Sequence, residues 1–160
     1  MDNIEFLGTV KMLAGLGLPE LVKLQARCRA DKCGEGERIS VEGQAADDFF
    51  LLKEGRVELR YELPGRESSS EQALSVIEPG GAWGWSALVP PHVYTLSAYC
   101  IAPRCVFLRF RREDLLGLFE SDWRMGYFFM RNLATIIAQR FNAVQDELAR
   151  QQGFDQMHQW

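Results

Sequence analysis

The feature of this sequence that most restricts its fold is a series of short apolar runs, separated by turn-forming residues, between residues 34 and 110. The runs cover residues 38–41, 48–53, 56–63, 72–77, 94–101 and 105–110. Strands this short cannot each bury a face alone, so the pattern favours a sandwich or a small barrel over a sheet of βαβ units. We expect a jelly-roll-like β-barrel over residues 34–110.

Helical patterns flank the predicted barrel. Leu18, Leu21 and Leu24 recur at helical spacing before it, and Ser121-Asp122 marks a break between two helices after it. The expected parts are an N-terminal helical segment at 1–33, the barrel at 34–110, C-terminal helices at 111–152 and a tail at 153–160. A chain of 160 residues suits one domain, so the predicted fold class is α+β, mainly β, in a single domain.

One apolar stripe runs along the second C-terminal helix for about five turns. Its members are Met130, Leu133, Ile137, Phe141, Val144 and Leu148. A stripe this long needs a partner surface. Pairing with the same helix of a second copy, along a coiled-coil-like seam, is the favoured interpretation, and we therefore expect a homodimer. Packing of the stripe onto its own domain is the alternative.

Charge and hydropathy restrict the partners. The formal net charge is −4, so the chain as a whole offers no electrostatic attraction to nucleic acid or anionic lipid. The N-terminus lacks a basic segment followed by an apolar run, and no stretch approaches the roughly 18 apolar residues of a membrane-spanning helix. We expect a cytoplasmic protein that binds neither nucleic acid nor membranes directly.

The four cysteines occur in the sequence as two Cys-x4-Cys motifs, Cys28 with Cys33 and Cys100 with Cys105. Four thiolates can bind zinc, but zinc and iron–sulfur pairs usually use closer spacings. Cys100 and Cys105 also lie in an apolar, strand-like stretch where a small thiol packs well. Buried, reduced cysteines are the favoured interpretation, and a metal or redox site is the alternative.

The stretch PGGAWGWSALVPPHVYTLSA, residues 79–98, places two tryptophans beside a glycine bend. A single helical turn at residues 86–89, capped by Ser86 and stopped by Pro90 and Pro91, is predicted between two strands. The free backbone N–H groups at its start would face the space that the barrel encloses, where an anion is favoured. The stretch therefore predicts an anion-binding pocket.

In order and spacing, four parts of the chain resemble the cyclic nucleotide-binding domain family, which includes the sensor domains of catabolite-activator-type bacterial regulators. They are Gly36-Glu37, Glu42-Gly43, the run DFFLLKEGRV at 48–57 and GWSAL at 84–88. The resemblance covers about residues 13–148. It implies a β-barrel around a phosphate-binding cassette, with a long C-terminal helix that dimerises and touches the base of the ligand.

The cassette of this family is a Gly-Glu-x-Ala-Leu motif followed by an arginine and a small residue. The resemblance places Gly84, Ala87 and Leu88 at the matching positions. Trp85 stands where the family has the glutamate that accepts the ribose 2′-hydroxyl. An indole has no acceptor, so Trp85 is expected either to stack on a base or to fill the pocket.

His92 is the nearest match to the cassette arginine, with Val93 at the small-residue position. An imidazole is only partly protonated at neutral pH and cannot form the bidentate hydrogen bonds that a guanidinium makes with a phosphate. A phosphate would therefore rest mainly on the helical turn and the Ser86 hydroxyl. The predicted ligand-binding residues are Gly84, Trp85, Ser86, Ala87, His92 and Val93.

These features predict a regulatory module that senses a cyclic nucleotide or another small anionic effector and signals through its long C-terminal helix. We expect no DNA-binding domain, so signalling would pass through a separate protein or through sequestration of the ligand. The alternative is a degenerate sensor with a filled pocket that acts as a protein-interaction scaffold. A jelly-roll metalloenzyme needs several histidines, whereas the sequence holds only His92 and His158. No catalytic residue, metal ligand or resident cofactor is predicted.

Overall fold

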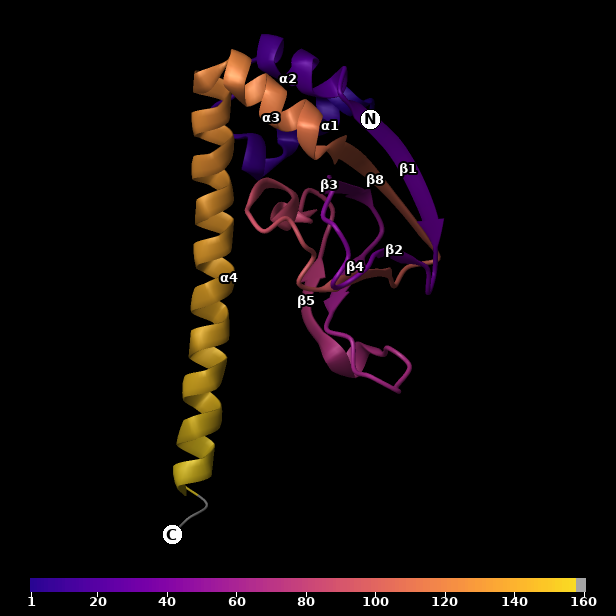
Figure 1. The fold of residues 1–160 in the computed structure, drawn as a ribbon, viewed down its shortest axis with the longest axis vertical. Helices are drawn as coiled ribbons and strands as arrows, with labels where there is room; N and C mark the ends of the chain where they lie inside the picture. Colours follow the sequence, from indigo (N-terminus) through magenta and orange to yellow (C-terminus); the bar gives the residue numbers. More distant parts are fainter. Residues whose placement is uncertain (158–160) are drawn as a thin grey trace.

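The computed structural model describes residues 1–157, with side chains through residue 153, and contains two antiparallel four-stranded sheets (Figure 1). The first sheet has the order β1 (Cys28–Gly34), β8 (Arg104–Arg111), β3 (Asp48–Glu54) and β6 (Ala82–Trp83). The second has the order β2 (Arg38–Ser40), β7 (Ser97–Cys100), β4 (Val57–Arg60) and β5 (Ala73–Ile77). The jelly-roll-like, mainly β fold predicted from the short apolar runs is confirmed.

Strand β3 forms the centre of the hydrophobic core. It buries Phe49, Phe50, Leu51 and Leu52, each at 1% exposure or less. Phe49 packs edge-on against Phe129 of the C-terminal helix, with 5.5 Å between ring centroids, whereas Phe50 stacks on Trp83 at 4.8 Å. Both faces of β3 are therefore covered, which explains why its sequence is a continuous apolar run rather than an alternation.

The helical segment predicted for residues 1–33 is wrong at its end, because β1 begins at Cys28. β1 pairs with β8 along its whole length, from Cys28 opposite Phe110 to Gly34 opposite Arg104. It is an edge strand with a mostly polar sequence and several exposed positions. Its conformation therefore depends on pairing with β8, which no local apolar pattern reveals.

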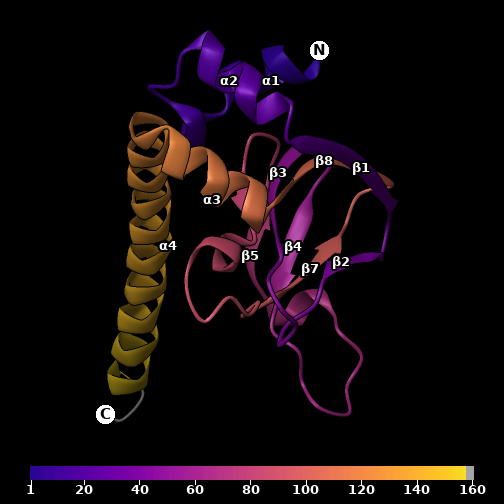
Figure 2. The same ribbon diagram turned by 45° about the horizontal axis from the view of Figure 1, so that its top comes forward.

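The N-terminal elements α1 (Asn3–Thr9), η1 (Lys11–Leu13) and α2 (Leu18–Gln25) lie at one end of the barrel (Figure 2). Helix α1 begins with a capping box, in which the Asp2 carboxylate accepts from the Glu5 amide at 2.8 Å. Buried side chains from all three elements join the main core. The N-terminal helices thus close the barrel at this end.

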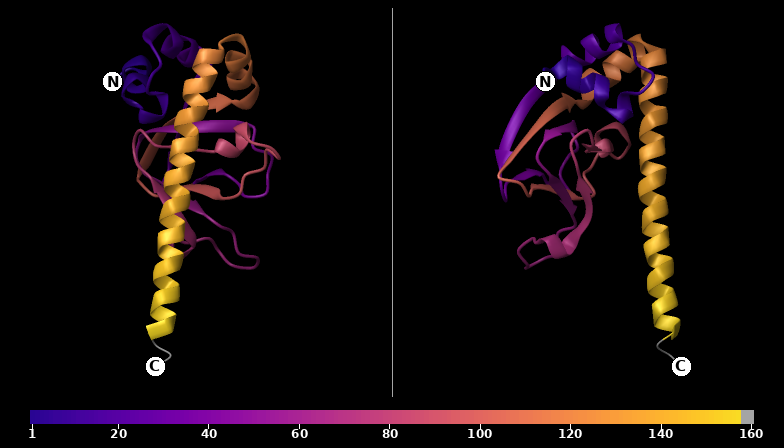
Figure 3. Two further views of the ribbon diagram at one scale, coloured as in Figure 1. Left: turned by 90° about the vertical axis from the view of Figure 1, so that its left-hand side faces the viewer. Right: turned by 180° about the vertical axis from the view of Figure 1, so that it is seen from behind.

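Two helices follow the barrel, α3 (Arg112–Ser121) and α4 (Trp123–Met157). The break between them falls where it was predicted, and the Asp122 carboxylate accepts from the Met125 amide at 3.1 Å at the start of α4. Helix α4 packs on α3 and η1, and its C-terminal half extends past them along the barrel (Figure 3). The C-terminal half is therefore the less firmly held part of α4.

Helix α4 continues to Met157, beyond the end predicted at residue 152 and into the predicted tail. No helix within residues 1–157 is both long and apolar enough to cross a membrane. Residues 158–160, which include His158, lie outside the described residues.

The apolar stripe of α4 divides into buried and exposed members. Leu133 is 2% exposed and packs in the chain's own core, so its predicted place in a dimer seam is wrong. The exposed members are Met130, Phe141, Val144 and Leu148. With Ala134 and the half-buried Ile137, they follow alternating spacings of four and three residues, which is the heptad spacing of a coiled-coil seam.

Candidate functional site

A pocket of about 680 Å³ lies between the second sheet, the segment after β6 and the C-terminal half of α4. Leu59 of β4 and Leu96 before β7 line it from the barrel, and Phe141 and Val144 line it from α4. Its volume and mainly apolar wall are typical of sites for small molecules. The pocket is therefore the candidate binding site of the chain.

The segment after β6 turns sharply at Gly84 into η3 (Trp85–Leu88), a short 3₁₀ turn. Gly84 has a φ of 78°, and a Cβ there would lie 2.9 Å from both the Asp48 carbonyl oxygen and the Phe50 ring. Only glycine fits this left-handed backbone and this close approach to β3. Gly84 is the residue that precedes the turn, so the predicted cap at Ser86 is wrong.

The structure brings three of the six predicted ligand-binding residues into the pocket wall: Gly84, Trp85 and Ser86. Ala87 is fully buried in the hydrophobic core, and neither His92 nor Val93 lines the pocket. The half-buried Trp85 forms one part of the wall beside the 680 Å³ volume. This geometry does not support a pocket filled by Trp85.

His92 and Val93 hold the loop behind the cassette. The Nδ1–H group of His92 donates to the Ser86 carbonyl oxygen at 3.3 Å, and the His92 carbonyl oxygen accepts from the Ala46 amide at 2.8 Å. His92 has a φ of 58°, which is uncommon outside glycine. Val93 pairs with Ala45 in an isolated bridge. These contacts hold both residues in the loop, and neither lines the pocket. His92 therefore does not occupy the place of the cassette arginine.

The pocket wall instead receives a positive charge from Arg140 of α4. Nη2 of Arg140 donates to the carbonyl oxygen of Ala82 at 2.7 Å. Ala82 lies just before the cassette turn, which consists of Gly84 and η3. The guanidinium is half-buried, and this burial lowers the pKa of Arg140 from its usual value. Among the side chains of residues 1–153, no carboxylate forms an ion pair with it. A charge desolvated without a counter-charge is unfavourable, so Arg140 is the most unusual group of the pocket.

Tyr94 fixes the wall of the pocket next to β3. Its hydroxyl donates to the Asp48 carbonyl oxygen at 2.7 Å and accepts from the Asp48 amide at 3.2 Å. Burial raises the pKa of Tyr94 to about 12, so the phenol stays neutral at physiological pH. The Asp48 carboxylate in turn lies 3.4 Å from Nη1 of Arg109. These bonds keep the loop before β7 fixed to β3 beside Gly84.

The remaining polar groups of the wall are hydroxyls, two indole N–H groups, the Glu147 carboxylate and the Gln151 amide. The carboxylate of Glu147 in α4 lies 3.8 Å from Nη1 of Arg150 and accepts from Nε2 of the Gln151 side chain at 3.2 Å, so neighbours on its own helix engage it. The hydroxyl-bearing residues of the wall are Ser40, Ser75, Ser86, Tyr94 and Thr95. An aromatic and apolar wall with one available guanidinium and several hydroxyls suits a ligand that combines a ring system with an anionic group.

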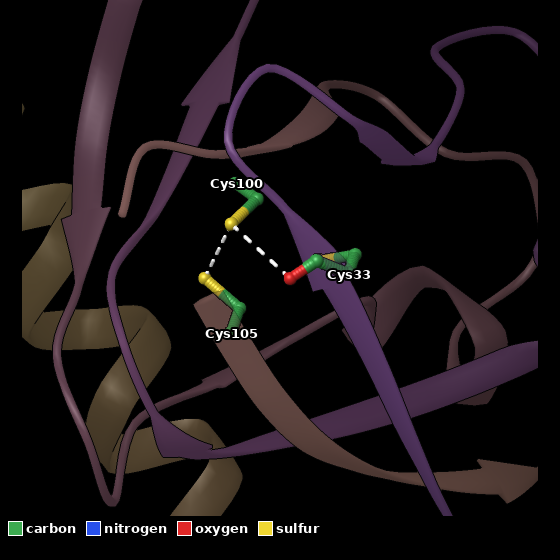
Figure 4. A group of neighbouring side chains, drawn as sticks. All are labelled: Cys33, Cys100 and Cys105. Atoms are coloured by element: carbon green, nitrogen blue, oxygen red, sulfur yellow. Dashed lines mark hydrogen bonds between the residues drawn. The ribbon is translucent and has the colours of Figure 1, made fainter. Parts of the chain in front are cut away.

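Three of the four cysteines lie together at a second place in the barrel (Figure 4). Cys33 of β1 is directly opposite Cys105 of β8, and Cys100 ends β7 in the other sheet. Their Sγ atoms lie within 4.8 Å of one another, with 2.7 Å between those of Cys100 and Cys105. Burial raises the pKa of the Cys33 and Cys105 thiols. Cys28, at the far end of β1, is not part of the group.

Comparisons with known proteins agree with this geometry. Residues 31–122 match the model of the cyclic nucleotide-binding domain. The cGMP-dependent protein kinase egl-4 of Caenorhabditis briggsae is 25% identical over 136 residues, and the chain spans only 18% of the length of that kinase. The aligned part is 84% of this chain.

Two solved structures illustrate the likeness of the fold. A Geobacter metallireducens protein, described as a candidate cyclic nucleotide-binding protein, superposes with a TM-score of 0.74 at 26% identity, over 88% of this chain and 99% of that chain. The Thermus thermophilus catabolite activator protein gives a TM-score of 0.69 at 24% identity, over 87% of this chain and 62% of that chain.

The matched segment runs from β1 to the end of α3 and contains both sheets, the Gly84 turn and the barrel side of the pocket. It covers more than half of the 160 residues. The resemblance carried by DFFLLKEGRV and GWSAL is thereby confirmed: the chain belongs to the cyclic nucleotide-binding domain family.

Proposed function

We propose that this domain is a regulatory ligand-sensing module, and that its pocket binds a cyclic nucleotide or a related small phosphate-bearing effector between the cassette turn and α4. The observation that carries the proposal is the Arg140 guanidinium, half-buried in the pocket wall without an acidic partner among the described side chains. A ligand phosphate would provide the missing counter-charge. Pairing there would offset the desolvation of the arginine.

In this proposal Arg140 binds the phosphate, as the arginine of the cassette does in the family. His92, at the matching position of this chain, cannot do so. A guanidinium binds a phosphate through two parallel hydrogen bonds, which adds geometric selectivity to charge. The bond from Arg140 to Ala82 already holds the guanidinium close to the cassette turn, beside Trp85 and Ser86. The anion site would therefore be shared by the cassette and α4.

Trp85 supports recognition of the ring system of the ligand. Its indole offers a broad apolar face but no acceptor for a ribose hydroxyl. A base that stacks on this face would also lie near Phe141 and Val144 on the α4 side of the pocket. The ribose would have the wall's serine and threonine hydroxyls as partners in place of the glutamate that the cassette lacks.

The position of Arg140 on α4 suggests how binding changes the shape of the molecule. Helix α4 is held by α3 and η1 near its start, while the pocket contacts its C-terminal half. A phosphate paired with Arg140 would tie this half to the cassette, so the ligand would favour one pose of α4 over others. A separate protein that contacts α4 would sense this change.

Calorimetric titration and thermal unfolding of the purified chain with cyclic AMP, cyclic GMP and cyclic di-GMP test the proposal. A ligand that binds only the folded chain raises the free energy of unfolding by about 2.7 kcal/mol at a hundredfold excess over its Kd. Inorganic phosphate at the same concentration is the control for a general anion effect. Stabilisation by at least one nucleotide but not by phosphate supports the proposal. A chain that none of them stabilises contradicts it and favours the scaffold function.

We also propose that two copies pair through the exposed heptad positions of α4. Four residues of this stripe, Ile137, Phe141, Val144 and Leu148, also line the pocket, so a partner helix paired along the stripe would cover the open side of the pocket. Replacing Phe141 and Leu148 together with glutamate places four like charges across the seam, and we expect a monomer in sedimentation equilibrium. The matched control is the double change Gln139→Glu and Asn142→Glu, at exposed positions on the same helix that neither belong to the heptad core nor flank it, which should keep the dimer mass. Equal masses for both variants would rule out this seam.

A further inference from the structure

The cysteine group has no part in the proposed ligand pocket. Cys33 and Cys105 belong to the first sheet and Cys100 to the second, so the three thiols join strands from both sheets (Figure 4). Cys100 and Cys105 are at most 1% exposed, whereas Cys33 is half-buried. Three sulfur atoms thus converge at one place, and of the three residues only Cys33 is partly exposed.

The sulfur positions suit a single ion with three ligands. A metal–sulfur bond of about 2.3 Å places three sulfurs around one ion about 4 Å from each other. The three Sγ atoms lie within 4.8 Å of one another, so small side-chain rotations reach this arrangement. The shortest distance, 2.7 Å between Cys100 and Cys105, has to widen.

The donor set selects among the metals. Thiolate ligands favour Cu(I) and zinc, but zinc sites in proteins are almost always four-coordinate. Among the described residues, no histidine, aspartate or glutamate joins the three cysteines. The burial of Cys100 and Cys105 also leaves little room for water as a fourth ligand. Cu(I) is stable with three sulfur ligands, so it fits the group better than zinc.

We propose that Cys33, Cys100 and Cys105 bind one Cu(I) ion as a three-sulfur site. In the metal-free chain, the Cys100 and Cys105 thiols donate to the carbonyl oxygens of Ala102 and Arg56 at 3.2 and 3.1 Å. Copper replaces these hydrogen bonds with copper–sulfur bonds, and the displaced thiol protons pass to solvent. The ion would then link β1, β7 and β8, so the loaded chain should unfold at a higher temperature than the metal-free chain.

The test is a competition for copper under anaerobic conditions. The reduced, desalted full chain is titrated into the coloured Cu(I) complex of bathocuproine disulfonate, and the loss of colour measures the copper transferred. We expect one Cu(I) per wild-type chain and at least tenfold weaker retention by Cys33→Ser. Cys28→Ser is the matched control, because Cys28 lies in the same strand with similar burial but outside the group. It should retain copper like the wild type.

Cys33 is half-buried, so its serine variant should fold, and a far-ultraviolet circular dichroism melt checks this. X-ray absorption of the loaded wild type should show three sulfur neighbours around copper. The proposal is overturned if the wild type takes no copper, if Cys33→Ser retains copper like the wild type, or if Cys28→Ser loses as much copper as Cys33→Ser. None of these outcomes depends on whether the pocket binds a nucleotide.

Discussion

The Arg140→Gln variant is expected to bind the proposed nucleotide ligand roughly 10- to 150-fold more weakly than the wild type, because a hydrogen bond to a charged group contributes about 1.5–3 kcal/mol. Glutamine keeps a donor for the Ala82 carbonyl oxygen but removes the charge that would pair with a phosphate. The Kd from calorimetric titration of the two chains, with whichever nucleotide binds the wild type, measures the effect.

Two further variants separate charge from structure. Arg140→Lys keeps the positive charge and should retain part of the affinity, although it loses the two-pronged geometry. Arg131→Gln makes the same change on the same helix at an exposed position outside the pocket and should bind like the wild type. The ligand-free Arg140→Gln chain should differ from the wild type by less than about 1 kcal/mol in free energy of unfolding, because the lost bond and the relieved desolvation offset each other. Equal affinity of Arg140→Gln and wild type would remove Arg140 from the site.

The largest effect on stability is expected for Trp83→Ala. Trp83 is 1% exposed, stacks on Phe50 with an angle of 8° between the rings, and meets Phe107 edge-on at 5.6 Å. Removing an aromatic side chain from such a core costs about 3–5 kcal/mol in free energy of unfolding, through lost burial and the cavity left behind. Urea unfolding of the ligand-free chain measures this loss.

Trp123→Ala is the matched control for this prediction. Trp123 is 82% exposed at the start of α4, so its replacement should change the free energy of unfolding by no more than about 0.5 kcal/mol. Similar losses for the two variants would contradict the packing described for the core.

Local sequence patterns predict those parts of the fold that depend on local chemistry. Short apolar runs and turn residues reveal the barrel, and Ser121-Asp122 reveals the break before α4, because strand burial and helix capping leave marks within a few residues. Strand β1 is missed because its sequence is polar and its conformation comes from pairing with β8. The burial of Leu133 is missed for a related reason: spacing identifies an apolar stripe but not the surface that covers it.

In the candidate site, too, the sequence predicts the residues of a local motif but not those that tertiary packing brings in. Gly84 can be identified from the sequence because it matches the glycine of the family's Gly-Glu-x-Ala-Leu cassette, and Trp85 and Ser86 follow it into the wall. Arg140 leaves only a faint mark in the sequence, as a basic residue next to Phe141 and three residues after Ile137 on a largely apolar helix face. Its place in the pocket depends on how α4 packs beside the barrel. His92 aligns with an arginine, yet the turn of the loop directs it to the Ser86 carbonyl oxygen.

The central claim, that the pocket between the cassette and α4 binds a cyclic nucleotide, is tested most directly by the indole N–H resonances of the tryptophans during a nuclear magnetic resonance titration. Trp85 lines the pocket, while Trp123 is exposed at the distant start of α4 and serves as an internal reference. We predict a saturable shift of the Trp85 resonance with an unchanged Trp123 resonance. A Trp85 resonance that stays fixed while another method detects binding, or equal shifts of both, would contradict the account.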